Sequence, residues 1–228
     1  MPVYLLTDDL IFPPVHLATP EGLLAIGGDL SPERLLLAYQ RGIFPWYSED
    51  EPILWWSPDP RLIIYPEELK ISRSLKRTIR RGLFRATMDT RFTQVIQACG
   101  RTRVRNGQGT WITPEMEKAY IRLHGLGYAH SVEIWYENKL VGGLYGVSLG
   151  RCFFGESMFS EVSDASKVAL VALRHHLQQH QFDFIDCQMP TDHLIRLGAR
   201  KIARNDFLAE LQSSLLWPTL QGTWHLST

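Results

Sequence analysis

The chain has 228 residues, 45% of them hydrophobic and 21% charged; this length suits one or two domains, and the composition excludes wholesale disorder and fibrous repeats. Lys and Arg number 24, as do Asp and Glu, so the net charge is zero. The sequence contains no run of about 18 apolar residues, which a membrane-spanning helix would need. The three cysteines lie far apart and the first residues lack a basic start, so we expect a cytoplasmic protein without a secretory signal, a disulfide framework or a structural zinc site.

The first 60 residues are acidic and dense in turn-forming residues. They carry nine Asp and Glu against two Arg, and Pro- and Gly-containing turns punctuate them. One helix is predicted over 32–41, with Ser31 as its N-cap and Gly42 as its stop. We expect residues 1–62 to form a small, irregular N-terminal domain.

The next segment is strongly basic. Residues 61–105 carry twelve Lys and Arg against three acids, and a short helix is predicted over 72–81. Leu75 and Ile79 form a narrow apolar stripe, which leaves five cations on the solvent side: Arg73, Lys76, Arg77, Arg80 and Arg81. Most such runs are solvated charged faces, but the local surplus favours a patch that binds a polyanion through its phosphates.

The remaining elements alternate between strands and helices. Apolar runs predict strands at 53–57 and 61–66, and three successive strands are predicted over 130–160, followed by one over 182–188. Helices are predicted over 91–98, 114–126, 163–180 and 205–215, with a second basic loop at 101–105. An antiparallel meander, a helix, then a further strand and helix indicate an α+β fold.

An acid and an amide lie near the end of the strand over 182–188. Side chains alternate along a strand, so Asp186 and Gln188 are expected on one face, close to the carboxyl end where ligands often bind. An acid among Phe, Ile and Cys needs a partner or a task. The alternative is that Asp186 caps a following turn, and the strand alone leaves both readings open.

Glu156 is surrounded by aromatic and thioether side chains in the string FFGESMF. It is interpreted as a buried acid with a raised pKa, a salt-bridge partner, an anchor for a cationic ligand, or a solvent-facing residue of a strand. Trp46 and Trp111 each lie among turn residues, where they either pack in a core or form a stacking platform for unpaired bases.

Two further patterns match a cofactor or metal site only in part. Arg122–Gly127 matches the R-x-x-G-x-G pattern of a coenzyme A pyrophosphate cradle, but a helix is predicted before it and a strand after it, the reverse of what a phosphate site needs. His176 and His180 have metal-ligand spacing without a third ligand, so a hydrated helix face is expected instead.

Seven strings occur in a fixed order along the chain: Gly22–Leu30 (GLLAIGGDL), Arg41–Trp46 (RGIFPW), Ile53–Arg61 (ILWWSPDPR), Gly109–Thr113 (GTWIT), Gly155–Phe159 (GESMF), Ala165–Lys167 (ASK) and Asp186–Gln188 (DCQ). Together they closely resemble the leucyl/phenylalanyl-tRNA–protein transferases, a family of bacterial aminoacyl transferases. The resemblance extends from about Phe12 to about Phe207.

The resemblance implies an acetyltransferase-like (GNAT) domain over 63–228, with a mixed, mainly antiparallel sheet. It implies transfer of Leu or Phe, and less readily Met, from charged tRNA to the α-amino group of an N-terminal Arg or Lys, which marks the acceptor protein for degradation. No metal or soluble cofactor is expected, and we expect a monomer with no membrane partner.

The same resemblance suggests roles for individual residues. We hypothesise that Gln188 accepts a hydrogen bond from the attacking amine, that Asp186 orients Gln188, and that Glu156 helps to place the acceptor or the terminal adenosine. Trp46 and Trp111 resemble the family's platform for that adenosine. The side-chain pocket would be lined by Phe153 and by Leu144 and Leu173, which stand where Met and Phe are expected, so the preference between Leu and Phe stays open. The five cations of the helix over 72–81 would hold the tRNA acceptor stem.

Two rival functions remain. An acetyl-CoA-dependent N-acetyltransferase is suggested by the fold and by Arg122–Gly127. A non-enzymatic RNA-binding module would explain the basic patch and the tryptophans, but it leaves Glu156, Asp186 and Gln188 without a task.

Overall fold

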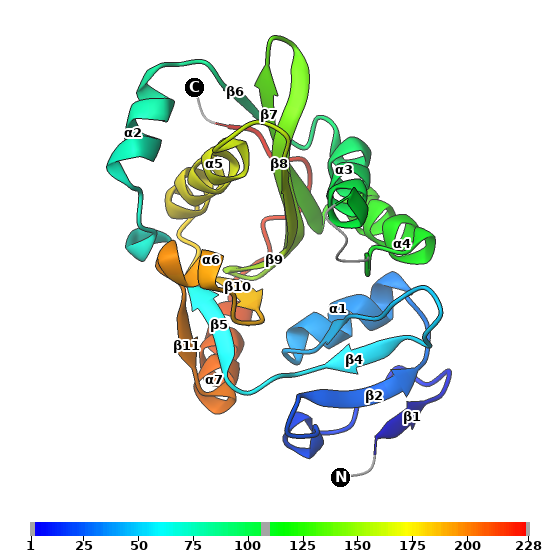
Figure 1. Cartoon of the computed structure of the whole chain (residues 1–228). Helices are drawn as coiled ribbons and strands as arrows, with labels where there is room; N and C mark the ends of the chain where they lie inside the picture. Colours follow the sequence, from blue (N-terminus) through cyan, green and yellow to red (C-terminus); the bar gives the residue numbers. More distant parts are fainter. Residues whose placement is uncertain (1–2, 106–109, 227–228) are drawn as a thin grey trace.

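The computed structural model describes residues 3–105 and 110–226 and contains two β-sheets (Figure 1). A four-stranded sheet has the order β1-β2-β4-β3, and a seven-stranded sheet has the order β11-β5-β10-β9-β8-β7-β6. The seven-stranded sheet begins in the chain at β5, whose first residue is Arg61. The predicted domain boundary after residue 62 therefore falls inside that strand, and the division into domains stays a prediction.

The first sixty residues contain more regular structure than their turn-rich sequence indicates. The strands of the small sheet are β1 (Tyr4–Leu6), β2 (Leu23–Gly27), β3 (Phe44–Pro45) and β4 (Leu54–Trp56). The helix α1 (Pro32–Gln40) confirms the helix predicted over 32–41. Its N-cap is Ser31, whose hydroxyl accepts the Arg34 N–H at 3.3 Å. Gly42, with φ of +71°, turns the chain from α1 into β3.

The seven-stranded sheet is mixed and mainly antiparallel. Its strands are β5 (Arg61–Ile64), β6 (Arg85–Met88), β7 (Ala129–Tyr136), β8 (Lys139–Leu149), β9 (Cys152–Ser160), β10 (Phe184–Gln188) and β11 (Arg200–Ile202). Among the described strands of this sheet, β9 and β10 are the parallel pair, and the other neighbours are antiparallel. The expected α+β class and the mixed sheet are confirmed.

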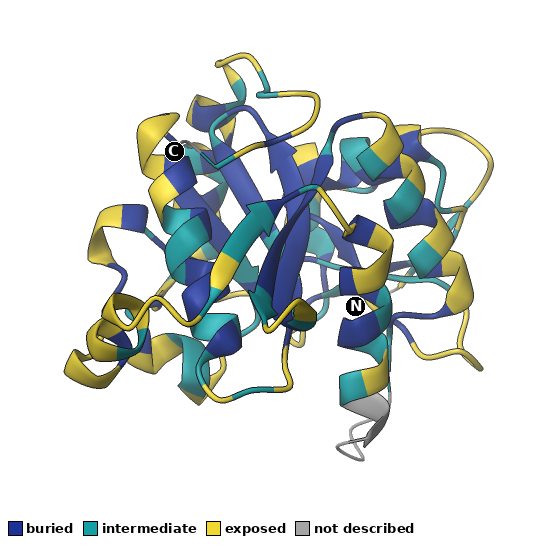
Figure 2. Cartoon of the chain, turned by 90° about the horizontal axis from the view of Figure 1, so that it is seen from above, coloured by how far each residue is buried: buried dark blue, intermediate teal, exposed yellow. Residues whose placement is uncertain are grey.

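Helices cover both faces of this sheet (Figure 1). Figure 2 shows its strands buried at the centre and the helices exposing their outer sides. One face is covered by α5 (Ala165–Gln179), with α2 (Arg73–Arg80) outside it, and the other by α3 (Phe92–Arg105) and α4 (Pro114–Gly125). The remaining helices are α6 (Asp192–Arg196), α7 (Arg204–Leu215) and the short 3-10 helices η1 (Val15–Leu17) and η2 (Pro66–Glu68). Within the described ranges no helix has the length and apolar character needed to cross a membrane.

The predicted basic loop at 101–105 is wrong, because α3 continues through Arg105. Val95 and Cys99 are four residues apart and both fully buried, so the apolar face of the helix runs past the predicted end at residue 98. Gly100 lies inside the helix instead of ending it.

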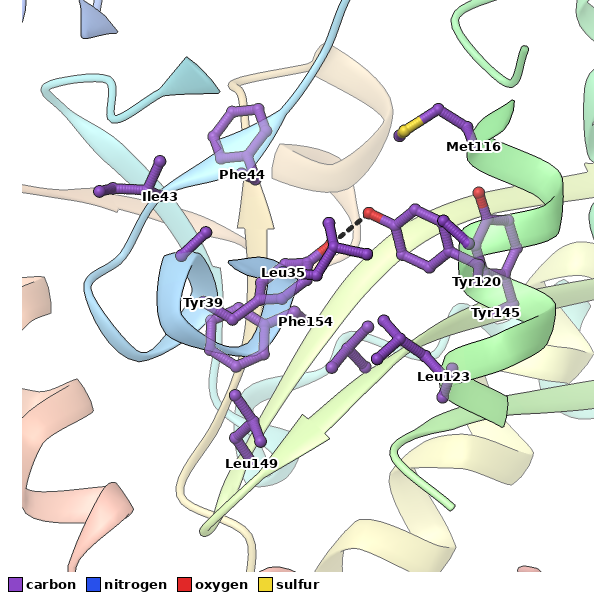
Figure 3. Close-up of a cluster of buried hydrophobic side chains, with 14 of the residues drawn as sticks. Leu35, Tyr39, Ile43, Phe44, Met116, Tyr120, Leu123, Tyr145, Leu149 and Phe154 are labelled. Atoms are coloured by element: carbon purple, nitrogen blue, oxygen red, sulfur yellow. Dashed lines mark hydrogen bonds between the residues drawn. The ribbon is translucent and has the colours of Figure 1, made fainter. Parts of the chain in front are cut away.

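Two hydrophobic clusters lie on opposite faces of the large sheet. The first joins α1 and the small sheet to β9, α3 and α4, and it includes the Tyr39 and Phe154 rings, whose centroids are 4.9 Å apart (Figure 3). The second lies under α5 and includes Leu144, Phe153 and Leu173. The first sixty residues therefore pack against the large sheet through a shared core.

Candidate active site

A cavity of about 420 Å³ lies where the end of β3 meets β9, β10, α5 and α6. Seven of the residues that the sequence singles out line it: Trp46, Trp111, Leu144, Phe153, Glu156, Leu173 and Gln188. They come from β8, β9, β10 and α5, from the turn after β3 and from the segment before α4, and they lie as far apart as 142 positions in the chain. The two indoles and the Gln188 amide therefore converge on one cavity.

Asp186 lies behind the cavity wall and is fully buried. Its carboxylate accepts hydrogen bonds from Nε and Nη2 of Arg61 at 2.8 and 2.7 Å, and the Arg61 side chain is equally buried. Such a two-pronged pair compensates the loss of water around both charges. The remaining Arg61 nitrogen, Nη1, donates to the Gly42 carbonyl at 3.1 Å, which ties the α1–β3 turn to β10.

The backbone changes direction between Asp186 and Gln188. Pairing of β10 with β5 is irregular there, and Gln188 has φ of +54°, in the left-handed region that is uncommon for residues other than Gly. Asp186 Oδ1 accepts the backbone N–H of Gln188 at 3.0 Å and so stabilises this turn. Both readings of Asp186 hold, because it has a buried partner and it also caps a turn. The two side chains form hydrogen bonds with different partners, however, because the bulge breaks the simple alternation expected of a strand.

The side-chain amide of Gln188 reaches Glu156. Its Nε2 donates to Glu156 Oε1 at 3.2 Å. Within the described part of the chain, the side-chain carbonyl oxygen of Gln188, Oε1, accepts no hydrogen bond, and the residue lines the cavity. This orientation leaves an acceptor for a ligand N–H group.

Two tyrosines hold the Glu156 carboxylate. Tyr39 of α1 donates to Oε1 at 2.8 Å and Tyr120 of α4 donates to Oε2 at 3.2 Å. The two hydroxyls also contact each other (Figure 3), and because each carries a single proton, one of them can donate to the other only in place of its bond to the carboxylate. Burial raises the pKa of Glu156 to about 7, although the two phenols stabilise its charged form. Of the four readings of Glu156, the acid with a raised pKa is the one that this geometry supports, and the side chain is partly buried because it lines the cavity.

The aromatic and apolar walls of the cavity differ in exposure. Trp46 is 40% exposed, and its carbonyl accepts the Trp56 indole N–H at 2.7 Å, which fixes the turn after β3. Trp111 is partly buried and lines the same cavity. The inner, apolar wall consists of residues that are nearly inaccessible to solvent, among them Leu144, Phe153 and Leu173. The cavity thus has an aromatic mouth, a polar side and a closed apolar end.

The cationic helix α2 does not line the cavity. Its cations are all exposed, namely Arg73, Lys76, Arg77, Arg80 and Arg81 at its end. Thr78 of α2 donates a hydrogen bond to Asp164 at 3.3 Å, just before α5, and α5 lies between α2 and the cavity. Any ligand that contacts both regions must extend across α5, as a long nucleic acid can.

Three site residues were missed by the sequence analysis: Arg61, Tyr39 and Tyr120. Arg61 stands in the ILWWSPDPR string, and a buried Asp186 demanded a cation, so these two signals together could have identified it. Nothing in the local pattern of α1 or α4 distinguishes the two tyrosines from ordinary core residues.

Neither the Arg122–Gly127 pattern nor the pair His176 and His180 lines the cavity. The helix α4 ends at Gly125 and β7 begins at Ala129, so no helix N-terminus follows Arg122–Gly127. His176 is 2% exposed and packs against Trp224, so the expectation of a hydrated helix face is wrong for this residue. No group of three metal-ligating side chains occurs among the residues that the structure describes.

Comparison with known proteins gives consistent matches. A family model described as leucyl/phenylalanyl-tRNA protein transferase matches residues 63–212, and a model of the N-terminal domain of that transferase matches residues 28–59. The chain is 58% identical over 224 residues to the leucyl/phenylalanyl-tRNA–protein transferase of Desulforapulum autotrophicum, covering 98% of both chains. It is 58% identical over 228 residues to that of Desulfatibacillum aliphaticivorans, covering 100% of this chain and 98% of the relative.

Likeness to solved structures is weaker. An aminoglycoside acetyltransferase from an uncultured soil metagenomic sample, in complex with sisomicin, is 14% identical and superposes with a TM-score of 0.39. The match covers 51% of this chain and 85% of the acetyltransferase. Nothing about activity follows from a likeness of this extent.

Proposed function

The chain belongs to the leucyl/phenylalanyl-tRNA–protein transferase family and is a transferase, and from this premise we propose that it moves Leu or Phe, and less readily Met, from charged tRNA to a protein. The acceptor in this proposal is the α-amino group of an N-terminal Arg or Lys, and the product is thereby marked for degradation. The observation that carries the proposal is the single cavity that holds two indoles, a polar pair and an apolar end.

The chemistry of this transfer suits such a cavity. An aminoacyl-tRNA is an activated ester, so its aminolysis needs positioning of the two reactants more than a strong catalyst. The amine must be uncharged to attack, and an α-amino group has a pKa of about 7.7–8.0. In the reaction the amine nitrogen forms a bond to the ester carbon, the bond from that carbon to the ribose oxygen breaks, and the amine proton passes to the ribose oxygen.

In this mechanism Gln188 orients the amine. Its carbonyl oxygen, which has no hydrogen-bond donor among the described residues, accepts an N–H of the attacking amine, while its Nε2 is held by Glu156. An amide is too weak a base to take the proton. The proton therefore reaches the ribose oxygen through the vicinal 2′-hydroxyl or a water molecule.

Asp186 and Glu156 act around Gln188. The charge of Asp186 is compensated by Arg61, and its carboxylate accepts the backbone N–H of Gln188. We therefore assign Asp186 the role of stabilising the left-handed backbone of Gln188, and not that of a base that removes a proton. Glu156 fixes the amide of Gln188 through Oε1 and helps to place the acceptor amine or the terminal adenosine. Tyr39 and Tyr120 keep the Glu156 carboxylate in position.

The other walls of the cavity would take the 3′-terminal adenosine of the charged tRNA and the amino acid attached to it. Trp46 and Trp111 would stack on the 3′-terminal adenosine. Phe153, Leu144 and Leu173 would enclose the Leu or Phe side chain. An apolar pocket gains only about 1–3 kcal/mol from one methylene group, so some transfer of Met is expected. The cations of α2 would contact phosphates of the acceptor stem without reading its sequence.

One assay tests the proposal against its rivals. The purified protein is mixed with radiolabelled Leu-tRNA and a peptide that begins with Arg, and the incorporated label is counted. The control reactions use a peptide that begins with Ala, and labelled acetyl-CoA in place of the tRNA. We expect labelling of the Arg peptide alone. Labelling from acetyl-CoA, or tRNA binding without any transfer, would overturn the proposal.

A further inference from the structure

The segment that follows α7 runs back along the large sheet and is attached to loops at the ends of its strands. The Gly150 N–H donates to Thr219 Oγ1 at 2.9 Å, the Gly222 N–H donates to the Gly127 carbonyl at 3.1 Å, and the Trp224 N–H donates to Asp89 Oδ2 at 2.7 Å. In Figure 1 this segment is the red trace that leads from α7 to the end marked C. Its course brings a tryptophan from the end of the chain to the core under α5.

Trp224 is 3% exposed and packs between two histidines. Its ring stacks on that of His130 of β7, with centroids 3.7 Å apart and planes 7° apart. On α5, the His176 ring lies 4.4 Å from the indole. The indole N–H donates to the Leu220 carbonyl at 3.0 Å, which fixes the orientation of the ring. The position of Trp224 is thus determined from β7, from α5 and from its own segment.

Trp224 also contacts the wall of the candidate active site from behind. Its ring centroid lies 5.9 Å from that of Phe153, which is 1% exposed and lines the cavity. The Phe153 ring lies directly over Gly146, where a Cβ atom would come within 2.6 Å of it, so the ring has no room to move in that direction. On α5, His176 is one turn beyond Leu173, another residue of the apolar wall. Trp224 itself does not line the cavity.

We propose that Trp224 is a positioning residue that sets the depth of the apolar end of the cavity and thereby the discrimination between Leu and Phe. The proposal rests on the proposed function, because it assigns the apolar end to the transferred side chain. The indole blocks the space into which the Phe153 ring would otherwise retreat. A smaller residue at position 224 leaves a void behind Phe153, and the ring then yields to a bulkier ligand.

The test is the ratio of kcat/KM for Phe-tRNA to kcat/KM for Leu-tRNA, measured with one acceptor peptide. We expect Trp224→Ala to raise this ratio at least about threefold, and Trp224→Phe to raise it by less. A purely structural role would lower both values together and leave their ratio unchanged. Thr219→Val is the matched control, because it removes an attachment of the same segment without changing the ring that contacts Phe153, and it is expected to leave the ratio as it is.

A second comparison assigns the effect to Phe153. In a Phe153→Ala background, Trp224→Ala is expected to change the ratio by less than twofold, because the ring that transmits the effect is gone. The inference is refuted if folded Trp224→Ala and Trp224→Phe keep the wild-type ratio, or if the full shift persists without Phe153. Calorimetry with 3′-phenylalanyl-adenosine and 3′-leucyl-adenosine gives the ratio of their binding constants and so measures the same discrimination without the transfer step. If the wild-type enzyme transfers neither amino acid but Trp224→Ala still changes the ratio of the two binding constants, the proposed function is refuted and this inference stands.

Discussion

Replacement of Arg61 by Met would test how the buried ion pair supports the site. The Arg61 and Asp186 side chains are both inaccessible to solvent, and two short hydrogen bonds join them. Removing one partner of such a pair leaves a buried charge without compensation and costs about 3–5 kcal/mol of the free energy of unfolding. Met is chosen because it retains apolar contact with the rings of Phe44 and Phe207, which flank the guanidinium.

The measurement is equilibrium unfolding in urea, which gives the free energy of unfolding of the wild type and of Arg61→Met under the same conditions. The double variant Arg61→Met, Asp186→Leu removes both charges and is expected to recover much of the stability.

Transfer activity separates the effect of the ion pair on stability from its effect on the site. Neither variant is expected to be active, because the single one loses the support of Asp186 and the double one loses the acceptor of the Gln188 N–H. The reasoning would be refuted if Arg61→Met cost less than about 1 kcal/mol, or if the double variant were as unstable as the single one.

Three further outcomes are expected. Gln188→Ala should lower the transfer rate about 10- to 100-fold, the value of one hydrogen bond to a group that gains charge, with tRNA affinity nearly unchanged in a filter-binding assay; equal losses would reject its role. Reversing the charge of Lys76, Arg77 and Arg80 together should reduce the slope of log affinity against log salt by about 2 to 3, and an unchanged slope would move the tRNA site elsewhere. Because burial raises the pKa of Glu156 to about 7, the transfer rate should rise with pH through that value as the carboxylate forms. Glu156→Gln should remove this limb of the pH profile and leave the titration of the amine, and a profile identical to wild type would contradict the assignment.

Local patterns predicted the helices well because their start signals are local. Ser31 and Ser72 each cap a helix by accepting a backbone N–H three residues on, and such a bond depends on neighbouring residues alone. The strand β11 and the helix α6 were not predicted. They are three and five residues long, and β11 exists through its pairing with β5, about 140 positions earlier in the chain. No local periodicity encodes an element that short.

The candidate site was predictable to the extent that it coincides with distinctive strings. Gln188, Glu156 and the two tryptophans lie in strings that resemble the family, and the cavity brings them together. The ion pair of Arg61 with Asp186 joins residues 125 positions apart, so the sequence indicated only that the acid needed a partner. The bulge that separates Asp186 from Gln188 was missed because an unbroken strand was assumed.

Neither the first sixty residues nor the rest of the chain forms the whole wall of the cavity. Trp46 belongs to the first sixty residues and lines the cavity, while the Tyr39 hydroxyl and the Gly42 carbonyl from the same part of the chain donate or accept hydrogen bonds with Glu156 and Arg61, which come later. A chain in which only the larger sheet is folded would therefore lack part of the cavity wall. A substitution in the first sixty residues that displaces Tyr39 or Gly42 would alter the site through Glu156 or Arg61 without touching the larger sheet.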